Sequence, residues 1–325
     1  MKAKILVYVL LAFILTTIHL AEAQQQAKVY KLGFLGSEYL SANIEAVRQA
    51  LRDLGYVEGQ NLIVEFRYAE GKIERLPELA DELVRLKVDV IVVTGSTPAA
   101  LAAKNASKKI PIVFLGTTNP VTTGLVDSLA RPGGNLTGLT NIHTELSGKR
   151  LELLKETIPK LSRVAVLWDP RGTGSALSWK ESQLAARELG LKVHSMEVRS
   201  ANDFENAFKA ATKARSGALS VTATPLLGAN RKRIADLAIN ARLPSLFVSN
   251  EGVDVGGLMA YGPNAIELYR RGAVYVDKIL KGTKPADIPV EQPMKFDFAI
   301  NLKTAKQIGL TIPPNVLARA NRVIR

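Results

Sequence analysis

The sequence predicts an α/β protein of two Rossmann-like lobes, in which helices flank parallel sheets and a hinge of several strands joins the lobes. Short apolar runs alternate with amphipathic stretches of helical period from Lys28 to Pro120, and the pattern restarts after Leu161. Such alternation is typical of parallel sheets with helices on both faces. At 325 residues the chain also exceeds the length at which one hydrophobic core usually keeps growing, which favours two domains.

The two stretches begin in the same way, with a strand, a loop, a helix and a second strand. Both first helices close on a Leu-Gly pair, Leu54-Gly55 and Leu189-Gly190, where glycine suits a left-handed cap. A duplicated module explains the likeness, although all βαβ units share these signals. The expected strands are 29–35, 62–68, 88–93, 110–115, 163–168, 191–198, 218–222 and 243–248, and the expected helices are 42–54, 73–86, 98–106, 175–189, 203–214 and 230–241.

Other segments are expected to cross between the lobes. A turn cluster at 131–135 precedes a run at 136–142 and a helix at 145–158, and a later helix at 265–280 precedes a proline-rich stretch and a run at 296–300. Several short connections act as a hinge that permits closure. The predicted N-terminal lobe is 28–140 plus about 262–290, and the C-terminal lobe is 141–261 plus about 291–325.

Residues 1–23 have the pattern of a cleaved export signal. Lys2 and Lys4 precede an apolar run at 5–18, which ends at Ala21-Glu22-Ala23, a small-x-small cleavage site. An uncleaved N-terminal anchor is the alternative. The chain has no cysteine, so a lipid-anchored cysteine and disulfides are excluded. We expect a periplasmic monomer without a lipid anchor.

The net charge of +13 raises the question of a nucleic-acid partner. The basic residues are spread along the chain, and no basic block alternates with stacking aromatics as single-strand binders require. Together with export, this argues for no nucleic-acid partner. The excess charge is consistent with solvated faces or with attraction of an anionic solute or membrane surface.

Reactive groups are scarce. After signal cleavage the histidines are His143 and His194, and neither has a second histidine four residues away that would build a metal face. No Gly-x-Ser-x-Gly elbow, Walker loop or His-Glu-x-x-His occurs. Gly172 and Gly174 resemble the first two glycines of a dinucleotide-binding motif, but Leu177 stands at the position of the third glycine. We therefore expect no catalytic residue, metal or cofactor, and interpret 172–177 as a flexible loop entering a helix.

A polar residue followed by proline recurs where strands pass into helices. The junctions are at Ser96-Thr97-Pro98, Thr117-Thr118-Asn119-Pro120, Asp169-Pro170 and Thr222-Ala223-Thr224-Pro225. Each suits an N-cap followed by the first helical turn. In parallel sheets, however, ligands bind beyond the carboxyl ends of the strands, where helix N-termini favour an anion. Because such junctions occur in both halves, closure of one lobe on the other would surround a ligand.

Further candidates follow from side-chain chemistry. Trp168 is expected either to form an apolar or stacking wall of the ligand site or to pack under its own loop, and the same two alternatives hold for Tyr39 and Tyr261. Glu251 and Asp254 are interpreted either as partners for an amine of the ligand or as solvated loop carboxylates. The predicted ligand-binding set is Ser37, Ser96, Thr97, Thr117, Thr118, Asn119, Trp168, Asp169, Thr222, Thr224, Asn250 and Glu251.

Several strings together resemble the tryptophan/tyrosine-uptake-like group of bacterial ABC transporter substrate-binding proteins, which has the type I periplasmic binding protein fold. They extend over nearly the whole mature chain: Leu54-Gly55-Tyr56, Gly95 to Ala100, Asn119-Pro120-Val121 with Gly124-Leu125-Val126, Pro132 to Gly138, Ile279 to Glu291 and Ile300 to Ala305. The resemblance implies a non-catalytic protein that holds a solute between its lobes and delivers it to an ABC permease and its ATPase.

By position, the resemblance carries the ligand role to Ser96 and Thr97, Thr117 to Asn119, Asp169, and Thr222 with Thr224. Members that bind aromatic amino acids usually have a threonine-aspartate pair where Thr118-Asn119 stands here, and a more polar segment at 225–227. An acidic partner for a ligand amine is therefore in doubt, and the expected solute is an amino acid or a similar small carboxylate-bearing molecule.

Two alternatives remain from the sequence. One is a periplasmic receptor that presents its closed form to a membrane sensor. The other is a secreted hydrolase that uses Asp169, Glu251 or Asp254, which would need two carboxylates across the cleft.

Overall fold

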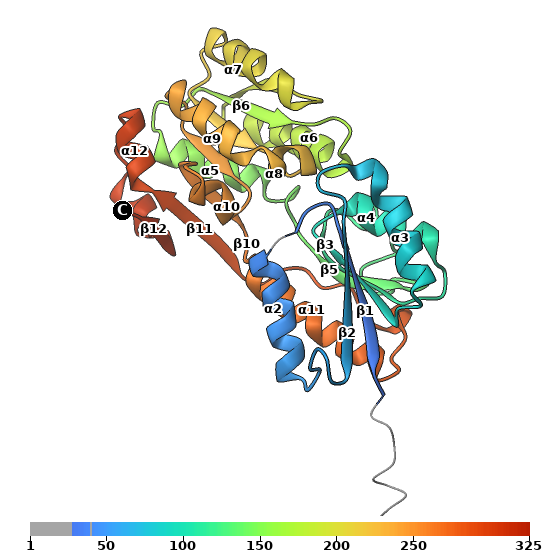
Figure 1. Ribbon diagram of the computed structural model, residues 1–325. Coiled ribbons are helices and arrows are strands. Elements are labelled where there is room, and N and C mark those ends of the chain that lie inside the picture. The colour runs from blue at the N-terminus through green and yellow to red at the C-terminus, as the bar shows by residue number, and fades with distance from the viewer. Residues whose placement is uncertain (1–27, 40) are drawn as a thin grey trace, which may run out of the picture.

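The computed structural model describes residues 28–39 and 41–325, so the signal predicted at 1–23 lies outside the described residues. Figure 1 shows two lobes, each built around its own sheet. The predicted α/β fold with two Rossmann-like lobes is confirmed. No helix within the described ranges is both long and apolar enough to cross a bilayer.

The first lobe contains a sheet of five parallel strands in the order β2-β1-β3-β4-β5. Alternate residues of its strands enter different cores: Val90 and Val92 face one, and Ile91 and Val93 face the other. This two-sided burial explains why the strands have continuous apolar runs. The strands are β1 (Tyr30–Gly36), β2 (Leu62–Tyr68), β3 (Val90–Thr94), β4 (Ile112–Thr117) and β5 (Leu136–Thr140).

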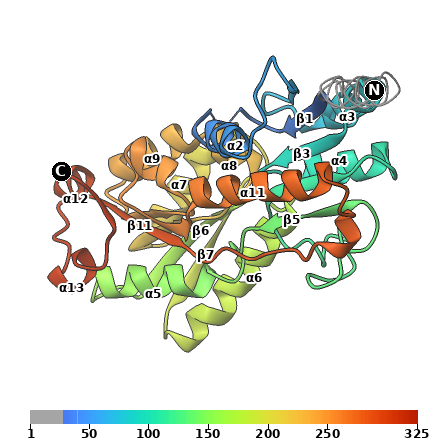
Figure 2. The ribbon, with the colours of Figure 1, turned by 90° about the horizontal axis from the view of Figure 1, so that it is seen from below.

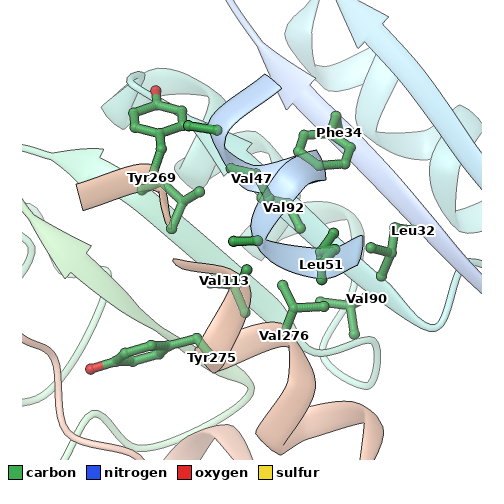
Figure 3. Packing of buried hydrophobic residues seen from close by; sticks show 14 of the residues in the cluster. Leu32, Phe34, Val47, Leu51, Val90, Val92, Val113, Tyr269, Tyr275 and Val276 are labelled. Atoms are coloured by element: carbon green, nitrogen blue, oxygen red, sulfur yellow. The ribbon is translucent and has the colours of Figure 1, made fainter. Parts of the chain in front are cut away.

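Helices cover both faces of this sheet. On one face, α2 and α11 pack together over β1, β3 and β4, although more than 200 residues separate the two helices in sequence. Figure 3 shows Val47 and Leu51 of α2 beside Tyr269 and Val276 of α11. The helices of this lobe are α2 (Ser41–Asp53), η1 (Ile73–Arg75), α3 (Leu76–Arg85), α4 (Thr97–Ala106), α11 (Ala265–Leu280) and η3 (Pro285–Asp287).

The second lobe contains a sheet of seven strands in the order β12-β11-β10-β9-β8-β6-β7. Its pairs are parallel except for β10 with β11, which is antiparallel. The predicted parallel sheets are confirmed, with β10 and β11 as an antiparallel pair in the second sheet. The strands are β6 (Arg163–Trp168), β7 (Lys192–Glu197), β8 (Ala218–Val221), β9 (Ser245–Phe247), β10 (Met259–Pro263), β11 (Phe296–Asn301) and β12 (Arg322–Ile324).

Two cores flank the second sheet, one beneath α7 and α9 and the other beneath α5. Figure 2 shows α5 and α6 on the side of this lobe away from α9. The helices are α5 (Ser147–Thr157), α6 (Thr173–Glu188), η2 (Ala201–Asp203), α7 (Phe204–Lys213), α8 (Pro225–Ala229), α9 (Arg231–Asn240), α10 (Asn250–Asp254), α12 (Leu302–Ile308) and α13 (Pro314–Leu317).

The two lobes repeat one topology. The order β7-β6-β8-β9-β10 reproduces β2-β1-β3-β4-β5, as a duplicated module would. Gly55 and Gly190 have φ of 90° and 66°, and the next residues, Tyr56 and Leu191, donate to the carbonyls of Leu51 and Ala186. The predicted left-handed caps are confirmed, and both have the Schellman hydrogen-bond pattern.

The described chain passes between the lobes three times, after β5, after β10 and before β11. The crossings are bonded to one another: Thr140 N donates to Glu291 O at 3.0 Å, and Asn264 N donates to Lys295 O at 2.9 Å. Three bonded connections are suited to opening and closing of the lobes with little twist.

Candidate functional site

The candidate site lies where the reversal points of the two sheets face each other. In each sheet the strand order reverses at the first strand, between β1 and β3 and between β6 and β8, and ligands of open α/β sheets bind beyond the carboxyl ends at such points. A cavity of about 380 Å³ lies between the loops that follow these strands. Its volume is within the range of small-molecule sites, roughly 300 to 1,000 Å³.

The cavity is lined by seven of the twelve predicted ligand-binding residues. They come from both lobes: Ser37, Ser96, Thr97, Thr118, Thr222, Thr224 and Glu251.

Hydrogen bonds between loops hold the cavity hydroxyls in each lobe. In the first, Ser37 Oγ lies 2.7 Å from Ser96 Oγ, and Ser96 Oγ accepts from Ala99 N as the N-cap of α4. In the second, Thr222 Oγ1 lies 2.7 Å from Ser175 Oγ, which accepts from Asp169 N. The two networks fix the loops after β1, β3, β6 and β8 relative to one another.

The other five predicted residues lie outside the cavity lining. Thr117 is fully buried within β4. Asn119 Oδ1 accepts from Thr144 Oγ1, and Asn250 Nδ2 donates to Asp297. Asp169 is 4 % exposed and forms a bidentate ion pair with Arg171, whereas Trp168 stacks on Trp179.

The N-cap reading of the proline junctions holds at two of the four. Ser96 caps α4 and Thr224 caps α8, but Pro120 and Pro170 enter turns instead of helices. At Asp169 the side chain accepts from Arg171 N two residues on, which is an Asx-turn. The prediction of a helix cap is therefore wrong at Asn119 and Asp169.

Aromatic side chains proposed as cavity walls pack elsewhere. The rings of Trp168 and Trp179 are stacked at 5.7 Å, and Trp168 Nε1 donates to Ser195 Oγ. Tyr39 packs against Phe66 and Tyr68, and Tyr261 packs against the aromatic residues of β11.

We expect Trp168→Phe to leave the affinity for a cognate solute within about twofold, because the indole stacks outside the cavity. Isothermal titration calorimetry checks this, with Trp179→Phe as the matched control. A tenfold loss in Trp168→Phe alone would show that the indole reaches the ligand.

Several cavity residues were not predicted from the sequence. Residues 172–175, interpreted as a flexible loop, include the first turn of α6. Glu38, Arg231 and Tyr269 also line the cavity. Glu38 follows the first strand as Ser37 does, so its position after β1 was an available signal. Tyr269 belongs to the apolar face of α11, and no local pattern marks it.

Charged side chains at the cavity differ in their pairing. Arg171 is held by Asp169, whose hydrogen bond raises the pKa of the guanidinium. Glu38, Arg231 and Glu251 form no ion pair within 4 Å among the residues that the structure describes. Of the three carboxylates considered for a hydrolase, Asp169 and Asp254 lie outside the cavity lining, and Asp254 pairs with Arg322 on the surface. Glu251 is the one of the three that lines the cavity.

The crossing beside the cavity contains a buried arginine without a carboxylate partner in the described chain. Arg150 of α5 is 2 % exposed; its Nε donates to Tyr261 O at 2.9 Å and its Nη1 to His143 O at 2.7 Å. Burial lowers the pKa of His143 to about 3, so the neutral imidazole accepts from Arg150 through Nδ1. Arg150 thereby ties the crossing after β5 to strand β10.

The chain has the two-lobed fold of the type I periplasmic binding proteins, with a cavity lined from both lobes. Residues 30–324 match the family described as "ABC transporter substrate binding protein", and the chain belongs to that family. The resemblance found from the sequence is confirmed.

Three known proteins are similar to this chain over most of its length. The tyrosine-binding protein of Clostridioides difficile (strain R20291) is 28% identical over 263 residues, which is 81% of this chain and 75% of that protein. The structure described as an ABC domain in complex with L-Trp from "Streptococcus pneumonia" has 26% identity, a TM-score of 0.85, and coverage of 91% of this chain and 100% of that one. The ligand-free, open structure of a substrate binding protein with adhesive properties from Clostridium difficile has 26% identity, a TM-score of 0.70, and coverage of 91% and 99%.

Proposed function

We propose that this protein is the periplasmic solute-binding component of an ABC importer, and that it binds an amino acid in the cavity between its lobes and delivers it to the permease. The observation that carries the proposal is the cavity itself, which combines hydroxyls and helix N-termini from both lobes with unpaired charges of both signs. A zwitterionic solute is complementary to such a site. Relatives described as tyrosine-binding and as an L-Trp complex make aromatic amino acids the first candidates.

The first turn of α6 offers a place for the solute carboxylate. The helix is 16 residues long, its N-cap is Gly172, and no side chain in the described structure caps it. Gly172, Thr173, Gly174 and Ser175 line the cavity, with Arg171 beside them. Free N–H groups and the helix dipole at such an end favour a carboxylate.

The arrangement of the lobes supports a ligand-holding form. Gly174 of the second lobe packs directly against Thr118 of the first, and the TM-score is higher for the L-Trp complex than for the open structure at the same sequence identity. A permease that recognises only the closed form would couple solute capture to docking. The same coupling would serve a membrane sensor.

The cognate amino acid is expected to raise the melting temperature, because it binds only the folded protein. A ligand at about 100 times its dissociation constant adds about 2.7 kcal/mol of stability. We would screen the proteinogenic amino acids by thermal shift, with the D-enantiomers of the chiral ones as matched controls, and confirm positives by calorimetry. If no amino acid binds while another solute class does, the amino-acid assignment is wrong.

Transport is tested separately. Deleting the gene should abolish uptake of the labelled amino acid, and purified protein should restore uptake in vesicles that contain the permease and its ATPase. Normal uptake without the protein would contradict an importer role.

A further inference from the structure

We infer that Glu38 and Tyr269 form a subsite that binds the ammonium group of the solute, an inference that rests on the proposed function. Both residues line the cavity. Glu38 Oε1 and Tyr269 Oη are buried, and neither makes a hydrogen bond of ordinary geometry among the described residues. Burial raises the pKa of the Tyr269 hydroxyl, and the Asn43 side chain lies close enough to it to lower that pKa in part.

Such atoms are uncommon in folded proteins, where the great majority of buried polar groups are paired and an unpaired one costs stability. Two of them in the lining of one cavity indicate that a ligand group completes the hydrogen bonding there.

The fold positions both atoms. Glu38 follows β1 at the carboxyl edge of the sheet. The ring of Tyr269, which is 3 % exposed, is anchored in the core between α2 and α11. In Figure 3 its hydroxyl points away from the apolar side chains labelled there. The wall therefore presents a carboxylate from a loop and a hydroxyl from a rigid helix.

The chemistry of the pair selects a cationic donor. An ionised carboxylate only accepts hydrogen bonds and a tyrosine hydroxyl can accept, whereas an ammonium has three donors and no acceptor. Burial raises the pKa of Tyr269, so its hydroxyl remains protonated. A ligand carboxylate at this wall would meet Glu38 as a like charge.

On the facing elements, Arg231 is the cation that competes with a ligand ammonium for the Glu38 carboxylate. A Cβ placed on Gly228 would lie 3.3 Å from Arg231 Nη2 and 3.8 Å from Glu38 Oε1, so the second lobe brings Arg231 toward the carboxylate. The two groups do not form an ion pair within 4 Å. Burial raises the pKa of Glu38, and Arg231 partly opposes this. Glu251 is the other carboxylate at the cavity and is the rival for the ammonium.

Calorimetry on five purified proteins tests the inference: native, Glu38→Gln, Tyr269→Phe, the rival variant Glu251→Gln and, as matched control, Glu74→Gln, whose exposed carboxylate lies outside the cavity lining. The probes are L-tryptophan and L-tyrosine, with the amine-free analogues 3-(indol-3-yl)propionate and 3-(4-hydroxyphenyl)propionate. We expect Glu38→Gln to weaken amino-acid binding about tenfold or more, since it removes a charge-assisted hydrogen bond, and to leave the analogues within about threefold. Tyr269→Phe should lose about threefold to tenfold for the amino acids, Glu251→Gln should lose less than Glu38→Gln, and the control Glu74→Gln should stay within about threefold.

Stability without ligand gives a second readout. Because the pKa of Glu38 is raised on folding, the native state binds the proton more tightly than the unfolded state, and this residue's contribution falls as pH rises above the unfolded value of about 4.5. Glutamine has no such contribution. Glu38→Gln should therefore melt above the native protein at pH 8, and the difference should shrink toward pH 4.

The outcomes separate the two claims. If the native protein binds no amino acid, the proposed function fails and the ammonium subsite fails with it. If the native protein binds amino acids but Glu38→Gln and Tyr269→Phe bind them equally well, or Glu251→Gln carries the loss, the subsite alone is wrong. Equal affinity of the native protein for an amino acid and its amine-free analogue also overturns the subsite. Should Glu38→Gln fail to fold, Tyr269→Phe, which keeps the ring in the core, decides by the same comparison.

Discussion

Replacing Arg150 by methionine is expected to lower the free energy of unfolding by about 3 kcal/mol. The change removes hydrogen bonds to the carbonyls of Tyr261 and His143 and to the His143 imidazole. Two partly buried carbonyls then lose these hydrogen bonds, at a cost of about 1 to 3 kcal/mol each. Relief from burying the guanidinium, whose pKa burial lowers to about 9, offsets part of that cost. Urea unfolding followed by circular dichroism measures the difference.

Lys149→Met on the same helix is the matched control. Lys149 pairs with Glu152 at partly exposed positions, and ion pairs near the surface contribute about 0 to 1 kcal/mol. A loss in Arg150→Met no larger than in Lys149→Met would show that Arg150 does not secure the crossing after β5.

Gly174→Val is expected to weaken solute binding about a hundredfold or more, because it prevents the lobes from closing. A Cβ at Gly174 would lie 2.7 Å from Thr118 Cγ2 and 3.0 Å from Thr118 Cβ. Rotating the Thr118 side chain leaves its Cβ in place, so the lobes must separate. Small-angle scattering should show a larger radius of gyration with solute present, and calorimetry should show the lost affinity.

The pair itself provides the control for this substitution. Gly174→Ala should also weaken binding, and adding Thr118→Gly, which removes the opposing Cβ, should recover part of the affinity. Unchanged affinity in Gly174→Val would show that closure does not bring these two residues together.

The inferred ammonium subsite also supplies the acidic partner for a ligand amine that the sequence does not provide at Asn119. The aspartate expected of aromatic-amino-acid binders is replaced there by an amide that accepts from Thr144 outside the cavity lining. A carboxylate is nevertheless available on the loop after β1, at Glu38. The acidic partner for an amine thus comes from a different strand end.

The sequence by itself determined the elements and predicted the strand ends at which the cavity lies, because both depend on local patterns. Two-sided burial gives continuous apolar strands, amphipathic runs give the helices, and the hydroxyls at Ser96 and Thr222 follow strand ends where parallel sheets place ligands. Only the tertiary structure decided which of these side chains share the cavity. Trp168 ends β6 and Thr118 follows β4, yet the first stacks on Trp179 and the second meets the opposite lobe. Tyr269 reaches the first lobe only because the chain crosses back after β10. Packing between segments that lie far apart in the sequence sets these positions, and no local period encodes such packing.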